Sequence, residues 1–394
     1  MKRFFEKIVE GILACSGFVT SLTIVLIVLF LFSEALGLFG SKVVEEGYVL
    51  ALNRQNTVNQ LSPAQIKGVF DEEITNWREL GGEDMPICLF RLEDVDEYYT
   101  EEQLGEAYEN AGTCITRLVE RTPGIVAFVP GQFIVRPDSV HVLEDQTISV
   151  RDVLAGAEWF PTATPAPQFG FLPLITGTLW VSLFAILIAL PFGLAVAIYM
   201  SEVANPRIRN LLKPVIELLS GIPSVVYGFF GLIVIVPFLQ QAFGLPVGES
   251  GLAGALVLAI MALPTIITVT EDAMRGCPRA MREASLALGA SQWQTIYKVV
   301  MPYSISGITS GVVLGIGRAV GETMAVLMVT GNAAVIPHSI LEPLRTIPAT
   351  IAAELGEAPA GGAHYQALFL LGVVLFFISL LINFTVEAVS PKQK

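Results

Sequence analysis

Six long apolar stretches constrain this sequence more than any other feature. They lie near residues 12–38, 171–200, 215–240, 252–274, 303–331 and 364–388, and few charges interrupt them. A helix needs about 20 apolar residues to cross the hydrocarbon core of a bilayer. Only 15% of the 394 residues are charged, whereas about 25% is usual for soluble domains. The sequence therefore predicts an α-helical polytopic membrane protein with six transmembrane helices.

Positively charged residues in the short flanks predict the orientation of these helices. They precede the first span, separate spans two and three and spans four and five, and follow the sixth span: Lys2, Arg3, Lys7, Arg207, Arg209, Lys213, Arg275, Arg279, Arg282, Lys298, Lys392 and Lys394. Lysine and arginine concentrate in cytoplasmic loops. We therefore expect both termini in the cytoplasm. The alternative for the first span is a signal peptide cut near Cys15, but the apolar run continues to Phe39, which favours an uncleaved anchor at 1–40.

The negative charge of the protein is confined to one segment. Residues 41–165 hold 22 acidic and 9 basic residues, whereas the rest of the chain is balanced. We expect this segment to be a water-exposed periplasmic insert between helices 1 and 2, followed by the helical core at 166–394. A proline-rich stretch at 160–167 reads as an extended linker. Since no basic patch occurs, a nucleic-acid partner is not expected.

Local signals in the acidic segment predict alternating strands and helices. Ser62 and Pro63 are suited to the cap and first turn of a helix at 61–70. Strands are expected near 51–58 and at 124–130, which indicates a small α/β lobe.

The cysteines and histidines predict little chemistry. An oxidising compartment would permit a disulfide between Cys88 and Cys114, although spacing alone cannot establish one. The three histidines are far apart in the sequence, so no metal site is expected.

The loop between spans four and five, at 275–302, has the pattern of an amphipathic helical segment. Ala284, Leu288, Trp293 and Ile296 recur at roughly helical spacing, and Gly289 predicts a break between two short helices. An amphipathic helix that its own chain does not bury needs a partner groove.

This loop resembles the corresponding loop of ABC importer permeases. The matching positions are Glu283, Ala284, Ser285, Gly289, Val299, Met301 and Pro302. The resemblance implies that 283–289 is a coupling helix that docks into a cytoplasmic ATPase. The chain has no Gly-x-x-x-x-Gly-Lys-Ser/Thr loop. We therefore expect no enzyme activity and no cofactor in this chain, with ATP and Mg²⁺ bound by a partner subunit.

Span five contains two opposite charges. Arg318 and Glu322 are four residues apart, which would place them on one helical face. Gly307, Gly311 and Gly315 recur every fourth residue, as do Gly317 and Gly321, and both small faces would let another helix approach closely. Since a charge in the bilayer centre costs about 3 kcal/mol, the pair either holds helices together or serves a transport path. In the second case Arg318 would bind a tetrahedral oxyanion, and Glu322 would hold Arg318 between transport events.

The residues around this pair resemble phosphate permeases of the PstC type. The similar stretches are Gly317-Arg-Ala-Val-Gly-Glu-Thr-Met-Ala-Val326, Gly221-Ile-Pro-Ser-Val-Val-Tyr-Gly-Phe-Phe-Gly231 and Thr346-Ile-Pro-Ala-Thr-Ile-Ala-Ala-Glu354. The resemblance covers 170–390 and implies the ABC importer permease fold. It also implies a substrate path through Arg318 and Glu322, to which Thr323 is a weaker addition. The partners that it implies are a second permease of the PstA type, two ATPase subunits and a soluble periplasmic phosphate-binding protein.

The insert is similar to part of one lobe of periplasmic phosphate-binding proteins. The similarity rests on Leu-Ser-x-x-Gln-Ile at 61–66, Ile-Thr-Asn-Trp at 74–77 and the strand at 124–130. Where those proteins have an anion-binding loop, this chain has Arg91 followed by four carboxylates within six residues. Carboxylates repel phosphate. We therefore expect a lobe that has lost its ligand site, and that either contacts the binding protein, regulates access or is a passive addition.

The interpretation that best fits these observations is the permease subunit of an ATP-driven phosphate importer in the bacterial cytoplasmic membrane. Two alternatives remain open. The first is a permease for another oxyanion, such as phosphonate or molybdate. The second is a membrane receptor for a periplasmic ligand, although the cytoplasmic loops are short for signalling.

Overall fold

The computed structural model describes residues 2–45, 47–143 and 146–389, except for the side chains at 2–9, 387 and 389. The positive side chains predicted to flank the first and last spans, Lys2, Arg3, Lys7, Lys392 and Lys394, lie outside this description. The chain divides into two compact units. Unit 1 comprises Met1–Phe32, Pro173–Ala358 and Leu368–Lys394, and unit 2 comprises Ser33–Leu172 and Pro359–Ala367.

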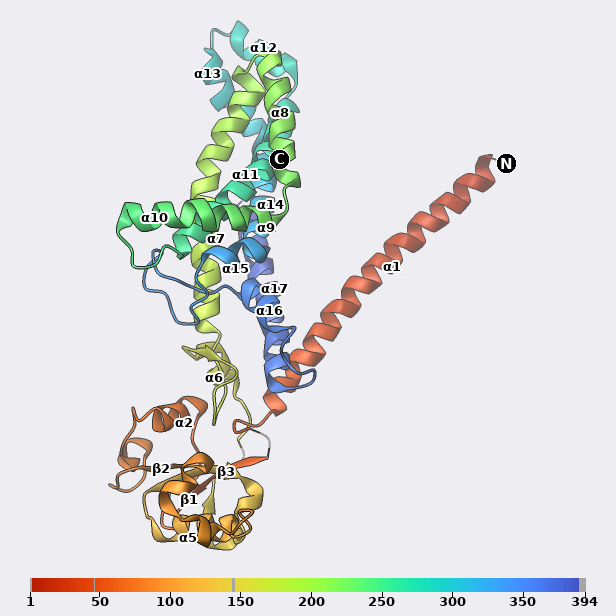
Figure 1. Ribbon diagram of the computed structural model, residues 1–394. Helices are drawn as coiled ribbons and strands as arrows, with labels where there is room; N and C mark the ends of the chain where they lie inside the picture. Colours follow the sequence, from red (N-terminus) through yellow and green to blue (C-terminus); the bar gives the residue numbers. More distant parts are fainter. Residues whose placement is uncertain (1, 46, 144–145, 390–394) are drawn as a thin grey trace. The chain divides into compact units, whose positions relative to one another are not determined.

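Unit 1 is helical (Figure 1). Its elements are α1 (Lys2–Gly37), α7 (Leu172–Ile198), α8 (Pro206–Gly221), α9 (Ser224–Phe230), α10 (Val236–Phe243), α11 (Gly251–Arg275), α12 (Arg279–Ala287), α13 (Gln292–Thr295), α14 (Met301–Gly321), α15 (Met324–Val329), α16 (Ile347–Glu354) and α17 (Ala363–Val389). Within the described residues, six segments are long and apolar enough to cross a membrane: Glu10–Gly40, Leu172–Val203, Ser224–Phe243, Gly251–Arg275, Gln292–Gly321 and Ala363–Val386. The prediction of six spans is confirmed.

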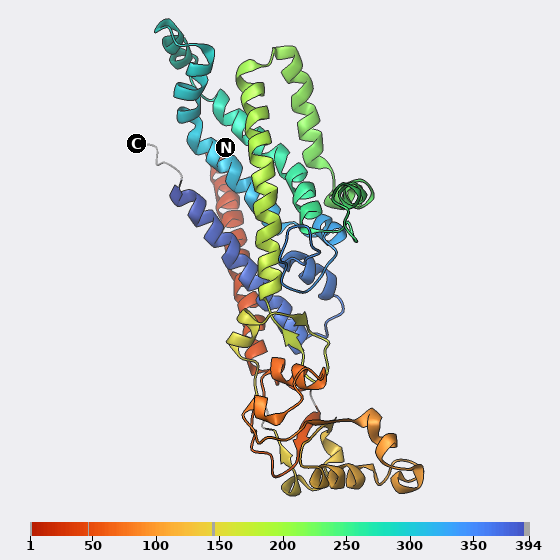
Figure 2. The same cartoon turned by 90° about the vertical axis from the view of Figure 1, so that its left-hand side faces the viewer.

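The third span begins later than the sequence predicts. The expected start near 215 falls inside α8, which ends at Gly221, and α9 begins only at Ser224. Between them Ile222 is extended, with φ −70° and ψ 127°, because the residue before a proline is disfavoured in a helix. Figure 2 views the segment 224–243 almost along its axis while α7 runs vertically, so α10 runs across α7.

The glycine face of span five packs against α11, as predicted. A Cβ on Gly307 would lie 2.2 Å from the Cβ of Ala273, and one on Gly315 would lie 2.7 Å from Ile266. Real Cβ atoms do not approach so closely, so only glycine permits this contact. Gly317 and Gly321, by contrast, have no neighbour within 4 Å of a Cβ. The prediction is therefore confirmed for Gly307, Gly311 and Gly315, whereas no described residue comes close to Gly317 or Gly321 despite the same spacing.

The end of α1 packs against α17 through aromatic rings. Phe30 meets Phe369 and Phe32 meets Phe377, both edge to face, with centroids 5.5 and 5.9 Å apart. Such pairs add about 0.5–1.5 kcal/mol beyond the area that they bury. The rest of α1 exposes apolar side chains such as Ile12 and Phe18, which suits a helix that lipid surrounds.

Unit 2 contains a four-stranded sheet with helices beside it. Its elements are β1 (Tyr48–Leu52), α2 (Pro63–Phe70), β2 (Cys88–Arg91), α3 (Val95–Tyr98), α4 (Glu101–Leu104), α5 (Ala111–Arg121), β3 (Ile125–Pro130), β4 (His141–Val142), α6 (Val150–Ala155), β5 (Trp159–Phe160) and β6 (Gln168–Phe169). The strand order is β2-β3-β1-β4, with β2 parallel to β3 and β1 antiparallel to both of its neighbours. Apolar residues of α5, such as Ile115 and Val119, pack with those of β3 in one buried core.

The start of α2 confirms the predicted cap. The Ser62 hydroxyl accepts a hydrogen bond from the Gln65 amide at 3.3 Å, and the Gln65 side chain accepts one from the Ser62 amide at 2.9 Å. This reciprocal pair satisfies two amides that the helix leaves without partners. Later in α2, Lys67 forms ion pairs with Asp71 and Glu158 at 2.8 and 3.1 Å. The hydrogen bond to Asp71 has the largest effect and raises the pKa of Lys67, and the hydrogen bond to Glu158 raises it further.

The disulfide that the sequence left open is not formed. Cys88 and Cys114 are both free thiols. Cys88 is exposed at the start of β2, whereas Cys114 is buried in α5 and its thiol is 3.7 Å from the carbonyl oxygen of Gln103. The two cysteines thus have different surroundings, and Cys114 already contributes to the apolar core.

Candidate functional site

The predicted substrate path lies where α14, the long helix of span five, ends. Helix α14 ends at Gly321, and Glu322 is extended, with φ −72° and ψ 136°. Helix α15 begins at Met324 after Thr323. The prediction that Arg318 and Glu322 share a helical face is therefore wrong, because the helix ends between them. A span can break in this way where the freed backbone groups are buried in protein or face a wet cavity.

Arg318 is a half-buried cation in the last turn of α14. In the part of the chain that the structure describes, no hydrogen bond or ion pair joins it to Glu322 or to another residue. It is close enough to Tyr227 of α9 for an electrostatic interaction, while the Tyr227 hydroxyl itself donates to the carbonyl of Leu219 at 2.8 Å. The guanidinium therefore keeps its donors available for an anion.

A cavity of about 530 Å³ opens beside the same break. Gly321 and Thr323 line it together with α16, the residues that follow α16, and Leu375 of α17. The Thr323 hydroxyl donates to the carbonyl of Gly321 at 3.3 Å, so it is already occupied by its own backbone. Arg318 and Glu322 do not line this cavity. Of the three predicted path residues, only Thr323 therefore lines this cavity.

The loop between spans four and five folds as two short helices, as predicted. Helices α12 and α13 flank Gly289, whose φ of 85° is in the left-handed region that favours glycine. Glu283 and Ala284 are exposed on α12, and Pro302 lies in the first turn of α14. Leu286 and Leu288, near the end of α12, are 49% and 90% exposed. Trp293 and Tyr297 are also exposed, but they lie within Gln292–Gly321, which is apolar enough to cross a membrane, so lipid can cover them. The exposed leucines outside this span mark an interaction site.

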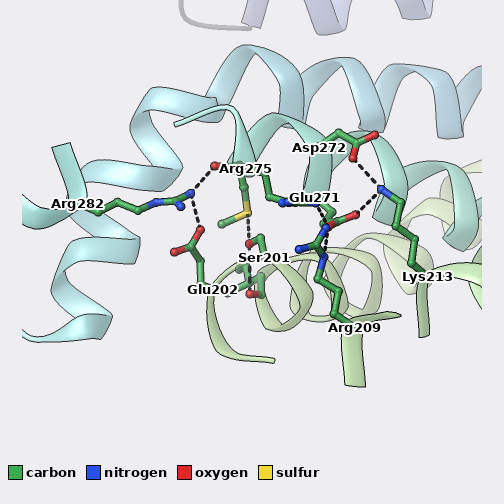
Figure 3. A network of polar contacts seen from close by, with 10 residues as sticks. Ser201, Glu202, Arg209, Lys213, Glu271, Asp272, Arg275 and Arg282 are labelled. Carbon is green, nitrogen blue, oxygen red and sulfur yellow. Dashed lines mark hydrogen bonds and ion pairs between the residues drawn. The ribbon is translucent and has the colours of Figure 1, made fainter. Parts of the chain in front are cut away.

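A buried carboxylate near the end of α11 organises a polar network that sequence reasoning missed (Figure 3). Glu271 is 1% exposed and forms ion pairs with three cations, Arg209 at 2.9 Å, Lys213 at 3.2 Å and Arg275 at 3.6 Å. Lys213 also pairs with Asp272 at 3.0 Å. The hydrogen bond to Asp272 has the largest effect and raises the pKa of Lys213. The hydrogen bond to Glu271 also raises this pKa, whereas burial lowers it. The network joins α8 to α11.

A second ion pair connects the short helices to the end of span two. Arg282 of α12 donates to Glu202 at 2.9 Å and to the carbonyl of Met274 at 2.8 Å (Figure 3). In the sequence, Glu202 and Glu271 stand at predicted span ends, where a charge usually faces water. The signal that could have drawn attention to them is the presence of unmatched arginines in the adjoining loops.

Comparison with known proteins gives the family. Residues 189–394 match the family of binding-protein-dependent transport system inner membrane components. The chain belongs to this family. It is 42% identical over 247 residues to a probable ABC transporter permease protein, YqgH, of Bacillus subtilis, a match that covers 63% of this chain and 80% of the relative.

Two further relatives carry the name phosphate transport system permease protein PstC. The protein of Mesorhizobium japonicum is 40% identical over 248 residues, covering 58% of this chain and 75% of the relative. The protein of Pasteurella multocida is 36% identical over 241 residues, covering 56% and 74%. With six apolar helices among its described residues, the chain is a multi-pass inner membrane protein and a transport permease subunit. Its family implies an ATPase and a substrate-binding protein as partners.

Proposed function

We propose that this chain is the permease subunit of an ATP-driven importer that moves inorganic phosphate across the bacterial cytoplasmic membrane. The observation that carries the proposal is the similarity of its helical core to permeases named for phosphate transport, at 36–40% identity over about three quarters of their length. The free guanidinium of Arg318 beside the helix break supports the same substrate class, because its planar donors suit a tetrahedral oxyanion.

Arg318 would bind phosphate transiently on its way across the membrane. A guanidinium that is already paired would have to exchange one carboxylate for another anion, whereas Arg318 has no such partner among the described residues. Glu322 follows the end of α14 and would lower the affinity for an anion through its negative charge, which favours release. Thr323 would have a smaller role, since its hydroxyl is bonded to Gly321.

The remaining partners follow from the same proposal. The segment 283–289, with Glu283, Ala284 and Gly289, would dock into one of two ATPase subunits that bind ATP and Mg²⁺, and Pro302 would start the helix behind it. A second permease of the PstA type would complete the membrane pore, and a soluble phosphate-binding protein would deliver the anion. Both termini would be cytoplasmic and unit 2 periplasmic, where it would contact the binding protein or regulate access.

Phosphate uptake by the complete complex in proteoliposomes tests the proposal. Replacing Arg318 by Ala removes charge-assisted hydrogen bonds to the anion, which we expect to lower uptake by about 100-fold, since such bonds are worth about 2–5 kcal/mol. Arg207→Ala is the matched control, because Arg207 is exposed in the first turn of α8. Uptake that is unchanged in Arg318→Ala would contradict the proposed path, and uptake of phosphonate or molybdate in preference to phosphate would support the alternative oxyanion.

A further inference from the structure

The last turn of span two is a meeting point for both short helices of the loop. Glu202 lies in the π-helical turn Tyr199–Val203 that ends this span. Its carboxylate accepts a hydrogen bond from Arg282 of α12 at 2.9 Å, and its main-chain carbonyl accepts one from Gln292 of α13 at 2.9 Å. Residues 80 and 90 positions away are thus attached to one residue.

Arg282 also attaches the loop to span four. The same guanidinium nitrogen that contacts Glu202 donates to the carbonyl of Met274 at 2.8 Å. Met274 lies in the last turn of α11, where a cation is favourable. Arg282 therefore bridges the π-helical turn at the end of span two and the end of α11.

The burial of this ion pair gives it a defined geometry. The side chains of Glu202 and Arg282 are 10% and 23% exposed. A carboxylate removed from water needs its partner in place, since loss of one member leaves an uncompensated charge. Exposed ion pairs on flexible side chains have no such requirement. The attachment is thus directional and not a loose surface contact.

The segment formed by α12 and α13 has an exposed side as well as this attachment. Leu286 and Leu288, near the end of α12, are exposed apolar side chains, while Ile296 and Val300 are buried against Met274 and Cys277. The segment therefore has an exposed apolar surface for a partner and a polar attachment to two spans.

We propose that Glu202 and Arg282 are positioning residues for coupling. Their ion pair holds α12 against the ends of span two and α11, so that a displacement imposed on the exposed apolar surface by the ATPase is transmitted to both spans. Without the pair, α12 moves but the spans follow incompletely, and ATP is hydrolysed without transport. This inference rests on the proposed function, since it assigns to named residues the transmission that such an importer requires.

The decisive quantity is the amount of phosphate moved per ATP hydrolysed. The complete complex, with its soluble binding protein, is measured in proteoliposomes with radiolabelled inorganic phosphate. We expect Glu202→Gln and Arg282→Gln each to lower the ratio at least about 5-fold, the lower end of typical coupling between sites, while ATP hydrolysis continues. The double variant should be no worse than either single variant, because both remove the same interaction. Additive losses, or a ratio equal to that of the wild type, would overturn the proposal.

Two matched controls separate charge from position. Glu217→Gln and Arg207→Gln change exposed residues of α8 that form no ion pair with another described residue, and both should leave the ratio unchanged. Glu202→Asp retains the charge and shortens the side chain by one methylene. It provides a milder change if the neutral variants do not assemble, and we expect it to lower the ratio by about 2-fold. A wild-type ratio in Glu202→Asp would also count against the proposal.

Hydrogen–deuterium exchange gives a readout that does not depend on the transported anion. Amides at 279–295 should exchange faster in Glu202→Gln than in the wild type, because α12 and α13 lose a common attachment. Unchanged exchange would overturn the positioning role. A wild-type complex that moves no phosphate would overturn only the proposed function, and the exchange data would still decide this inference.

Discussion

Replacing Glu271 by Gln removes a carboxylate that Arg209, Lys213 and Arg275 share. The side chain of Glu271 is 1% exposed, whereas those of the three cations are 23%, 29% and 44% exposed. The variant therefore leaves three positive charges near a buried amide. The cations can recover part of their hydration, and Lys213 keeps its ion pair with Asp272 at 3.0 Å.

These exposures set the magnitude. Breaking a fully buried ion pair by removing one partner costs about 3–5 kcal/mol. Because the cations are partly hydrated and Gln can still accept one hydrogen bond from Arg209, we expect a smaller loss of about 2–3 kcal/mol. For a domain of 150–250 residues, each kcal/mol lowers the unfolding midpoint by about 2–4 °C. The midpoint of Glu271→Gln should therefore fall by about 4–12 °C.

Thermal unfolding of the purified complex tests this expectation, with all variants heated at one rate because large assemblies often unfold irreversibly. Asp272→Asn is the matched control, since Asp272 is the next residue of α11 and its side chain is 59% exposed with one ion pair. It should cost about 0.5 kcal/mol and about 1–2 °C. Equal shifts for the two variants would refute the reasoning, since they would mean that burial does not determine the contribution of these carboxylates.

Two further predictions concern other parts of the chain. Gly307→Leu should abolish assembly of the complex, measured by co-purification of its subunits, because a side chain there collides with α11. Gly317→Leu should assemble normally, since no described neighbour lies within 4 Å of a Cβ at Gly317. Equal yields of complex for the two variants would contradict the close contact between Gly307 and α11. Because the pKa of Lys67 is raised, its ion pairs stabilise the fold fully below the ordinary lysine pKa of 10.5, and this stabilisation is lost as pH rises through the folded pKa. Above pH 10.5 the unfolding midpoint of the wild type should therefore fall more steeply with pH than that of Lys67→Met. Parallel curves for the two proteins would exclude this contribution.

The sequence determined the features that depend on local chemistry. Six apolar runs specify six helices long enough to span a membrane, since length and hydropathy suffice for that. The Ser62 cap and the left-handed Gly289 were predictable because each is satisfied within a few residues of its own position. The spacing of Gly307 and its repeats likewise predicted a close helix contact.

Only the tertiary structure decided which charges meet. Arg318 and Glu322 have helical spacing, yet the helix ends at Gly321, and neighbouring elements rather than spacing determine where a span may break. Glu202 and Glu271 read as ordinary charges at span ends. Arg275 is a local partner of Glu271, four residues away, but Arg282 and Arg209 come from positions 80 and 62 residues away from Glu202 and Glu271. No local pattern encodes such pairs, because a buried carboxylate is stabilised by whichever cation the packing of distant helices brings to it.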